Sequence, residues 1–374
     1  MIRELPLYVY PPSVVYSGNQ FDALKDAVRA EQLTTQIVDL YSARQLFLLE
    51  NAVTDEGFRY TAQAFMQVCK LAAPGLSRLL ADLSGTIPRP TDSIYDAQLA
   101  IKTFNAVINT RFRCIERYMA VLDNQKKYII GFVPMRNFYL DNCSWFERIH
   151  ESIQNYATPF RFAGARATGR TISLWYRAEK AALKANVKGQ QLPLYAGVYF
   201  CNGESIGKSI RGAKTCFSSI GQFLGNFKDH GGSVKHSALM FESEFDQLLD
   251  YIANVDLPLA ELGSALHAAA GRKLVTTFST VKSIRQVKRR LVAFLTENNV
   301  ASYVAKRAVD RALYGDESGE LIDENFYQAL DKKTWFDVVS SVLKDAKTFS
   351  FSRRERIEQA IFDFLLNFEG EDDA

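Results

Sequence analysis

The sequence has few of the residues on which metal sites and disulfide frameworks depend. Its 374 residues include five cysteines and four histidines. No two cysteines form a CxxC pair and the histidines are scattered, so we expect no disulfide framework, no metal site and no cofactor. Only His230 and His236 lie close together, and we expect them on either side of a turn at Gly231 and Gly232.

Long apolar segments are also missing. No run of 18 apolar residues occurs, so the sequence predicts no membrane-spanning helix. The first residues, MIRELPLYVYPPS, contain neither a long apolar stretch nor a signal-peptide cleavage site. We therefore expect no membrane partner and a cytoplasmic location.

Motifs of known catalytic chemistry are absent as well. The sequence has no GxSxG, no HExxH and no acid pair with two-metal spacing. Glu242 and Glu244 fall where a helix is predicted to begin, and there acids stabilise the helix dipole. We therefore expect a protein that is not an enzyme, with no catalytic residues.

One stretch, LYAGVYFCNGESIGKSIRG from Leu194 to Gly212, looks like a phosphate-binding loop. Such a loop needs four residues between its first glycine and the Gly-Lys-Ser sequence, but only three separate Gly203 from Gly207. Glu204 would also place a negative charge in the anion site. We predict instead a hairpin or bulged turn between two strands.

The charge changes sign along the chain although the net charge is only +3. Residues 1–157 are neutral, 158–240 carry +9, 241–269 carry −6, 270–314 carry +8 and 315–374 carry −8. One interpretation is that the basic and acidic blocks neutralise each other in the folded protein. The other is a surface that binds a polyanion, for which the acidic end of the chain competes.

The hydrophobic period divides the chain into two parts. The N-terminal part mixes helical spacing, as in 21–32 and 93–112, with short apolar runs, and we interpret 34–42 and 44–51 as strands. Hairpins are predicted at 117–134 and 160–177, and 194–200 pairs with a strand near 213–219. From Phe241 onward about six segments have helical spacing, and one of them covers 323–346.

These patterns predict an α+β fold with a β-rich centre and a helical C-terminal part. We expect an α+β domain at 1–240, a helical domain at 241–368 and an acidic disordered tail at 369–374.

Four short motifs resemble a family of prophage and plasmid proteins described as "domain of unknown function 932". They are Ala64-Phe65-x-x-x-Cys69, the hairpin from Arg117 to Val133, Asn202-Gly203-Glu204-x-x-Gly207, and the basic segment NFKDHGGSVKHSA. The resemblance covers roughly residues 45–240. The sequence lacks the family's Cys-Asn-Gly, because Phe217 and Ser218 follow Cys216.

This resemblance implies an origin in a phage or another mobile element, whose proteins often handle single-stranded DNA in recombination. The family has no established activity to transfer. We therefore hypothesise a DNA-binding, oligomeric protein that binds or anneals single-stranded DNA.

The segment VKSIRQVKRRLVAF gives this hypothesis its residues, because apolar positions occupy one helical face and five cations occupy the others. The β-rich part adds basic residues near its predicted hairpin. The predicted nucleic-acid-binding residues are Lys208, Arg211, Lys214, Lys235, Lys282, Arg285, Lys288, Arg289 and Arg290. The segment FRFAGARATGRTISLWYR mixes arginines with aromatic residues, which suits either base stacking or a core strand.

Two alternatives remain open. The first is a structural or interaction protein, such as a virion component or an antagonist of host defence, that extends its N-terminal segment to a neighbour. The second is an enzyme with a pocket that the motifs do not reveal. The sequence does not distinguish DNA from RNA as the ligand.

Overall fold

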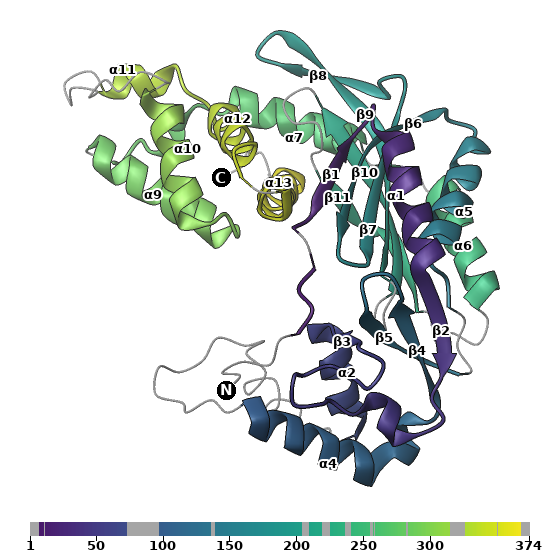
Figure 1. Cartoon of the computed structure of the whole chain (residues 1–374). Helices are drawn as coiled ribbons and strands as arrows, with labels where there is room; N and C mark the ends of the chain where they lie inside the picture. Colours follow the sequence, from purple (N-terminus) through teal and green to yellow (C-terminus); the bar gives the residue numbers. More distant parts are fainter. Residues whose placement is uncertain are drawn as a thin grey trace.

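A computed structural model gives the fold of the chain (Figure 1). It describes residues 7–10, 12–72, 97–135, 139–203, 209–218, 225–235, 241–254, 257, 259–281, 283–314, 326–349 and 351–367. Two β-sheets and a set of C-terminal helices confirm the predicted α+β class.

The larger sheet has seven antiparallel strands in the order β1-β6-β7-β9-β10-β11, with β8 paired to β9. Its strands are β1 (Val14–Ser17), β6 (Phe160–Thr168), β7 (Thr171–Ala178), β8 (Leu183–Val187), β9 (Gln190–Gly203), β10 (Ser209–Ser218) and β11 (Gly225–Lys235). Both predicted strand pairs of this region, 160–177 and 194–219, are therefore confirmed.

The smaller sheet has the order β2-β4-β5-β3. Its strands are β2 (Thr35–Asp39), β3 (Arg59–Tyr60), β4 (Tyr118–Asp123) and β5 (Tyr128–Pro134). The β4–β5 hairpin is the one predicted at 117–134. Helices α2 (Ala62–Ala72) and α4 (Ala97–Ile115) cover this sheet through a core that includes Phe65, Phe104 and Phe132.

Three helices bury their apolar faces on the larger sheet. They are α1 (Phe21–Thr34), α5 (Asn142–Gln154) and α6 (Phe241–Asn254). Leu174, Val198 and Phe200 from the sheet share one core with Trp145 of α5 and Phe245 of α6. Strand side chains alternate between faces, so the helices occupy one face of these strands.

The remaining helices form a lobe with a second core, which also includes residues of the larger sheet. They are α7 (Leu259–Gly271), α8 (Leu274–Thr277), α9 (Ile284–Glu297), α10 (Ser302–Tyr314), α11 (Phe326–Asp331), α12 (Trp335–Ala346) and α13 (Phe351–Leu366). Leu194, Cys216 and Phe227 of the sheet lie in the same apolar cluster as these helices. The division at residue 240 stays a prediction, because α6 and α7 pack directly on the larger sheet.

The segment that looks like a phosphate-binding loop connects two strands. β9 ends at Gly203 and β10 begins at Ser209, and the two pair antiparallel from Leu194–Ser218 to Cys201–Arg211. A phosphate-binding loop leads into a helix whose N-terminus faces the phosphates, whereas here a strand follows. The hairpin prediction is confirmed.

Three local predictions are wrong. The segment 44–51 holds a 3-10 helix, Ala43–Leu46, rather than a strand, because Ser42 and Gln45 form a capping box. Gly231 and Gly232 lie inside β11 rather than in a turn: a Cβ at Gly232 would come within 2.8 Å of the Leu248 side chain. The single helix expected at 323–346 is divided, because Thr334 caps a new helix, α12.

A buried ion cluster joins the two sheets. Arg170, in the β6–β7 turn, places its Nη2 3.1 Å from Asp123 Oδ2 at the end of β4 and its Nη1 3.4 Å from Glu31 Oε2 in α1. Its Nε donates to Tyr128 Oη at 3.3 Å. The Arg170 side chain is 4% exposed and that of Asp123 is fully buried. We call this set the Arg170 cluster.

Substitution of Glu31 should change how stability depends on pH. Burial raises the Glu31 pKa, nearby Arg170 and Lys126 oppose this effect, and Asp123 adds to it. A raised folded-state pKa stabilises the fold at low pH, and this contribution is lost as pH rises through the folded-state value. The free energy of unfolding of Glu31→Gln, relative to that of the parent, should therefore increase as pH rises above 4.5, the ordinary pKa of a glutamate side chain. Urea unfolding at several pH values measures this difference, and a constant difference would contradict it.

Candidate nucleic-acid interface

Helix α9 carries basic side chains away from the core. Ile284, Val287, Leu291 and Leu295 are buried, and Ser283 caps the helix by accepting a hydrogen bond from the Gln286 amide. The apolar stripe at three- and four-residue spacing fixes the helix against α10, and the remaining positions face solvent. The exposed arginines on those positions are Arg285, Arg289 and Arg290.

These three arginines differ from the lysine beside them. Among the described residues, no carboxylate forms an ion pair with Arg285, Arg289 or Arg290, whereas Lys288 pairs with Asp310 of α10. Lys282, the fifth predicted cation, lies outside the described residues. The structure therefore leaves three arginines of the predicted helix available for an external anion and uses Lys288 in packing α9 on α10.

The neighbouring helix uses its arginines internally. Arg311 forms an ion pair with the fully buried Asp345 of α12, and Arg307 Nη2 lies 3.7 Å from the same carboxylate. Neutralisation between basic and acidic blocks, the first interpretation of the charge pattern, thus holds for α10 and α12. It does not extend to the arginines of α9 among the described residues.

A second group of arginines lies on the larger sheet, on the face opposite the α1, α5 and α6 core. Cross-strand partners share a face, and Arg161 is the direct partner of Arg177, Arg166 of Ser173 and Arg211 of Cys201. We name this surface, with its aromatic residues Trp175, Tyr195, Tyr199 and Phe217, the arginine–tyrosine face. On the described parts of β6, β7, β9 and β10, this face contains no carboxylate.

Aromatic rings lie between these arginines. Trp175 and Tyr199 are direct cross-strand partners with ring centroids 5.3 Å apart. The Arg177 guanidinium stacks 4.4 Å from the centroid of the half-buried Tyr195 ring, and its buried Nε has no hydrogen-bond partner among the described residues. This aromatic cluster contains no helical residue among those described. The face therefore combines positive charge with partly accessible rings.

The segment FRFAGARATGRTISLWYR contributes side chains to both faces of the larger sheet, so the core-strand interpretation is confirmed for part of it, and base stacking stays a prediction. Phe160, Phe162 and Tyr176 point to the helix-covered core, and Arg170 belongs to the buried cluster. Trp175 points to the opposite face with the other arginines. A strand's alternation between faces produces this division, and a bulge at Phe162–Gly164 keeps both sets in register.

The predicted β-region cations are distributed over both faces of the sheet. Arg211 and Lys235 are exposed on β10 and β11. Lys214 is buried, with 7% exposure, and its Nζ donates to the Ala253 carbonyl at 3.4 Å, near the C-terminal end of α6. A cation there compensates the helix dipole, so we correct the prediction and remove Lys214 from the interface. Lys208 lies outside the described residues.

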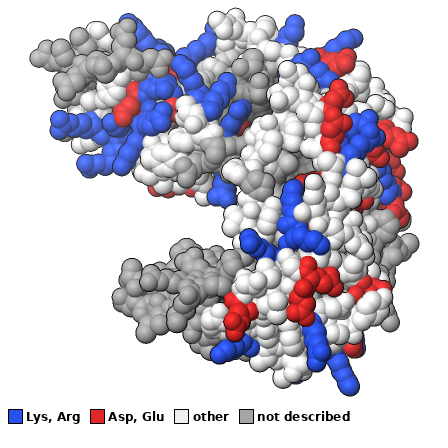
Figure 2. All heavy atoms as spheres, viewed as in Figure 1, with Lys and Arg blue, Asp and Glu red and all other residues white. Residues whose placement is uncertain are grey.

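Figure 2 shows how the cations are distributed on one side of the molecule. Lys and Arg side chains gather over the lobe that contains α9, α10 and α11. A smaller group lies where the surface is hollowed, between this lobe and the part that carries the four-stranded sheet. A long polyanion could contact both groups from this side.

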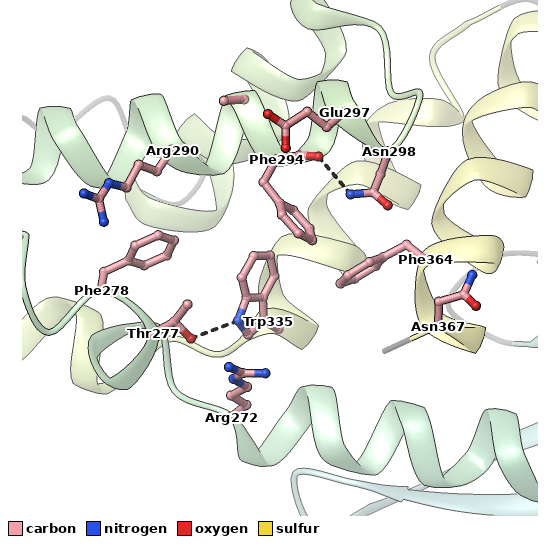
Figure 3. Close-up of a pocket in the computed structure, with 11 residues that line it drawn as sticks. Arg272, Thr277, Phe278, Arg290, Phe294, Glu297, Asn298, Trp335, Phe364 and Asn367 are labelled. Carbon is pink, nitrogen blue, oxygen red and sulfur yellow. Dashed lines mark hydrogen bonds between the residues drawn. The ribbon is translucent and has the colours of Figure 1, made fainter. Parts of the chain in front are cut away.

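A cavity of about 730 Å³ adjoins α9 (Figure 3). Four aromatic side chains line it: Phe278, Phe294, Trp335 and Phe364. Trp335 Nε1 donates to Thr277 Oγ1 at 3.1 Å, which fixes the indole ring. Arg290 of α9 and Arg272 at the end of α7 also line the cavity. No local pattern in the sequence signals this site, because its residues come from five separate segments.

The described residues were also compared with the requirements of a metal site and of a membrane-spanning helix. Within the described ranges, no group of three or more His, Cys, Asp or Glu residues is arranged to hold a metal ion. None of the described helices is long and apolar enough to cross a membrane.

The N-terminal segment packs on its own chain where it is described. The Tyr8 amide donates to the Tyr60 carbonyl at 2.7 Å, and the Tyr8 ring stacks on Tyr128 with centroids 4.0 Å apart. β1 then joins the larger sheet at its edge, next to β6. The described part of this segment is thus anchored to both sheets of the same chain.

Comparison of the chain with models of protein families, with curated proteins and with solved structures finds no match. The resemblance to the family "domain of unknown function 932" therefore stays a prediction. The two arginine surfaces and the cavity are the features of the structure that bear on function.

Proposed function

We propose that this chain is a nucleic-acid-binding protein of a phage or other mobile element. It binds single-stranded DNA in the host cytoplasm, acts without catalysing a reaction, and anneals or protects strands as a homo-oligomer. The arginine–tyrosine face and the arginines of α9 form its binding surfaces.

The observation that carries this proposal is the direct cross-strand pairing of Arg161 with Arg177. Like charges opposite each other destabilise a sheet, and here no carboxylate on the described part of that face offsets the repulsion. A bound polyanion would remove this cost. Phosphates supply the charge, and they release counterions when the arginines neutralise them.

The aromatic residues favour single strands over duplex. Unpaired bases expose π-faces that stack on tyrosine and tryptophan and beside arginine, whereas duplex bases are already stacked. Tyr195 and Tyr199 are partly accessible on the same face as Arg161, Arg177 and Arg211. A sulfated or carboxylated polymer would satisfy the arginines but not the rings.

Binding of a fluorescent 20-nucleotide strand and of the matching duplex, measured from 20 to 500 mM salt, tests this function. We expect the logarithm of the affinity for the strand to fall linearly with the logarithm of salt concentration, by about 0.7 for each phosphate neutralised. The strand should bind at least about tenfold more tightly than the duplex, which corresponds to one stacked base. If neither binds at the lowest salt, the interaction-protein alternative replaces the proposal.

A further inference from the structure

We propose that the cavity beside α9 binds one unstacked nucleotide of the bound strand. This inference rests on the proposed function, because Arg290 belongs both to the basic surface of α9 and to the cavity wall. A volume of about 730 Å³ lies within the range of small-ligand sites and exceeds what a single base needs.

The aromatic walls match the base. Phe294 lies 4.9 Å from Trp335 and 5.3 Å from Phe364, measured between ring centroids, so the three rings form a continuous apolar wall. Phe294 is only half-buried and gives the cavity an accessible ring. Stacking on such rings needs no particular base, which suits a strand of any sequence.

The polar residues match the other parts of a nucleotide. In Figure 3, Arg290 lies above Phe278 and Arg272 lies below Trp335, whereas Asn298 and Asn367 lie toward Phe294 and Phe364. The amide nitrogen of Asn298 donates to the Phe294 carbonyl at 3.0 Å, so its Oδ1 remains an acceptor among the described residues. Asn367 Nδ2 likewise donates to the Asp363 carbonyl at 2.8 Å.

This arrangement assigns the two arginines to phosphates of the strand and the two amide oxygens to an N–H donor of the base, which every base supplies as an exocyclic amine or, in thymine, as the ring N3–H. Glu297, which also lines the cavity, adds a further acceptor on the base side in Figure 3. A cavity built for an apolar ligand would need none of these five polar groups.

Three probes and three variants test the proposal. The probes are a 12-nucleotide DNA strand, the same strand without its bases, and the duplex. The variants are Phe294→Leu, which keeps apolar volume but removes the ring, Arg290→Gln at the cavity, and Arg285→Gln as the matched control outside it. Circular dichroism melting confirms that each variant folds.

Phe294→Leu should weaken binding of the base-containing strand about tenfold and leave the abasic strand unaffected. Arg285→Gln should weaken all three probes by the same factor. Arg290→Gln should also weaken all three, and it should additionally reduce the preference for the strand with bases. These results would support a base in the cavity.

Other results would overturn the inference about the cavity, and they distinguish its failure from failure of the proposed function. If Phe294→Leu binds every probe as the parent does, the strand binds without using the cavity, and the proposed function stands. A further comparison uses chains that lack residues 368–374. If Phe294→Leu lowers the preference for the strand with bases only in the shortened chain, the acidic end of the chain is the natural occupant of the cavity and the inference fails. If the parent binds no probe at low salt, the proposed function fails with it.

Discussion

Replacing Arg170 by leucine should lower the free energy of unfolding by about 3–5 kcal/mol. The fully buried Asp123 carboxylate would lose the Arg170 guanidinium, its ion-pair partner among the described residues, and a buried carboxylate without a counterion is costly. Leucine fills much of the arginine's volume, so the decrease in the free energy of unfolding comes from the lost charge and not from a cavity. Guanidinium unfolding followed by circular dichroism measures the change.

Two variants make this prediction specific. Adding Asp123→Asn to Arg170→Leu should recover part of the loss, because asparagine is neutral and keeps an acceptor oxygen for the turn amides of Gln125 and Lys126. Lys273→Leu breaks the exposed pair with Asp331 and should cost less than about 1 kcal/mol. If Arg170→Leu costs no more than Lys273→Leu, the cluster does not hold the two sheets together.

Replacing Arg285, Arg289 and Arg290 by glutamine should weaken binding of single-stranded DNA about a hundredfold at 0.1 M salt. Each phosphate contact contributes about 0.7 to the slope of log affinity against log salt, so three contacts contribute about 2. The variant should fold, because exposed substitutions away from the core usually change stability by no more than about 0.5 kcal/mol. The same salt titration with the 20-nucleotide strand measures both slope and affinity.

Lys288→Gln is the matched control on the same helix. Asp310 already neutralises Lys288, so its loss should leave the salt slope almost unchanged. This ion pair is the reason that Lys288 is not one of the three replaced residues, although the sequence predicts it as a nucleic-acid-binding residue. A triple variant with the slope of the parent would remove α9 from the interface.

Local patterns in the sequence determined the class of fold and most of its elements. The helical spacing from Ile284 to Leu295, the turn residues after Asp123 and the apolar run before Gly203 each predict an element that the structure contains. Spacing is a property of neighbouring residues, so it can be read without the tertiary structure. The apolar run at 44–51 predicted a strand wrongly, because the Ser42 cap starts a 3-10 helix there.

The sequence also determined that positive charge concentrates in 158–240 and 270–314. It could not determine which of these cations are available. Lys214 and Arg211 are three positions apart on β10, and only the stacking of α6 on one face decides that Lys214 is buried and Arg211 exposed. The packing of α10 on α9 likewise pairs Lys288 with Asp310.

The tertiary structure alone decided the two arrangements on which the function is argued. Arg161 and Arg177 are 16 positions apart, and strand register makes them direct partners. Phe278, Arg290, Trp335 and Phe364 come from separate segments and meet only when α9, α12 and α13 pack. Such contacts depend on the free energy of burying distant apolar faces together, and no local period in the chain encodes which faces will meet.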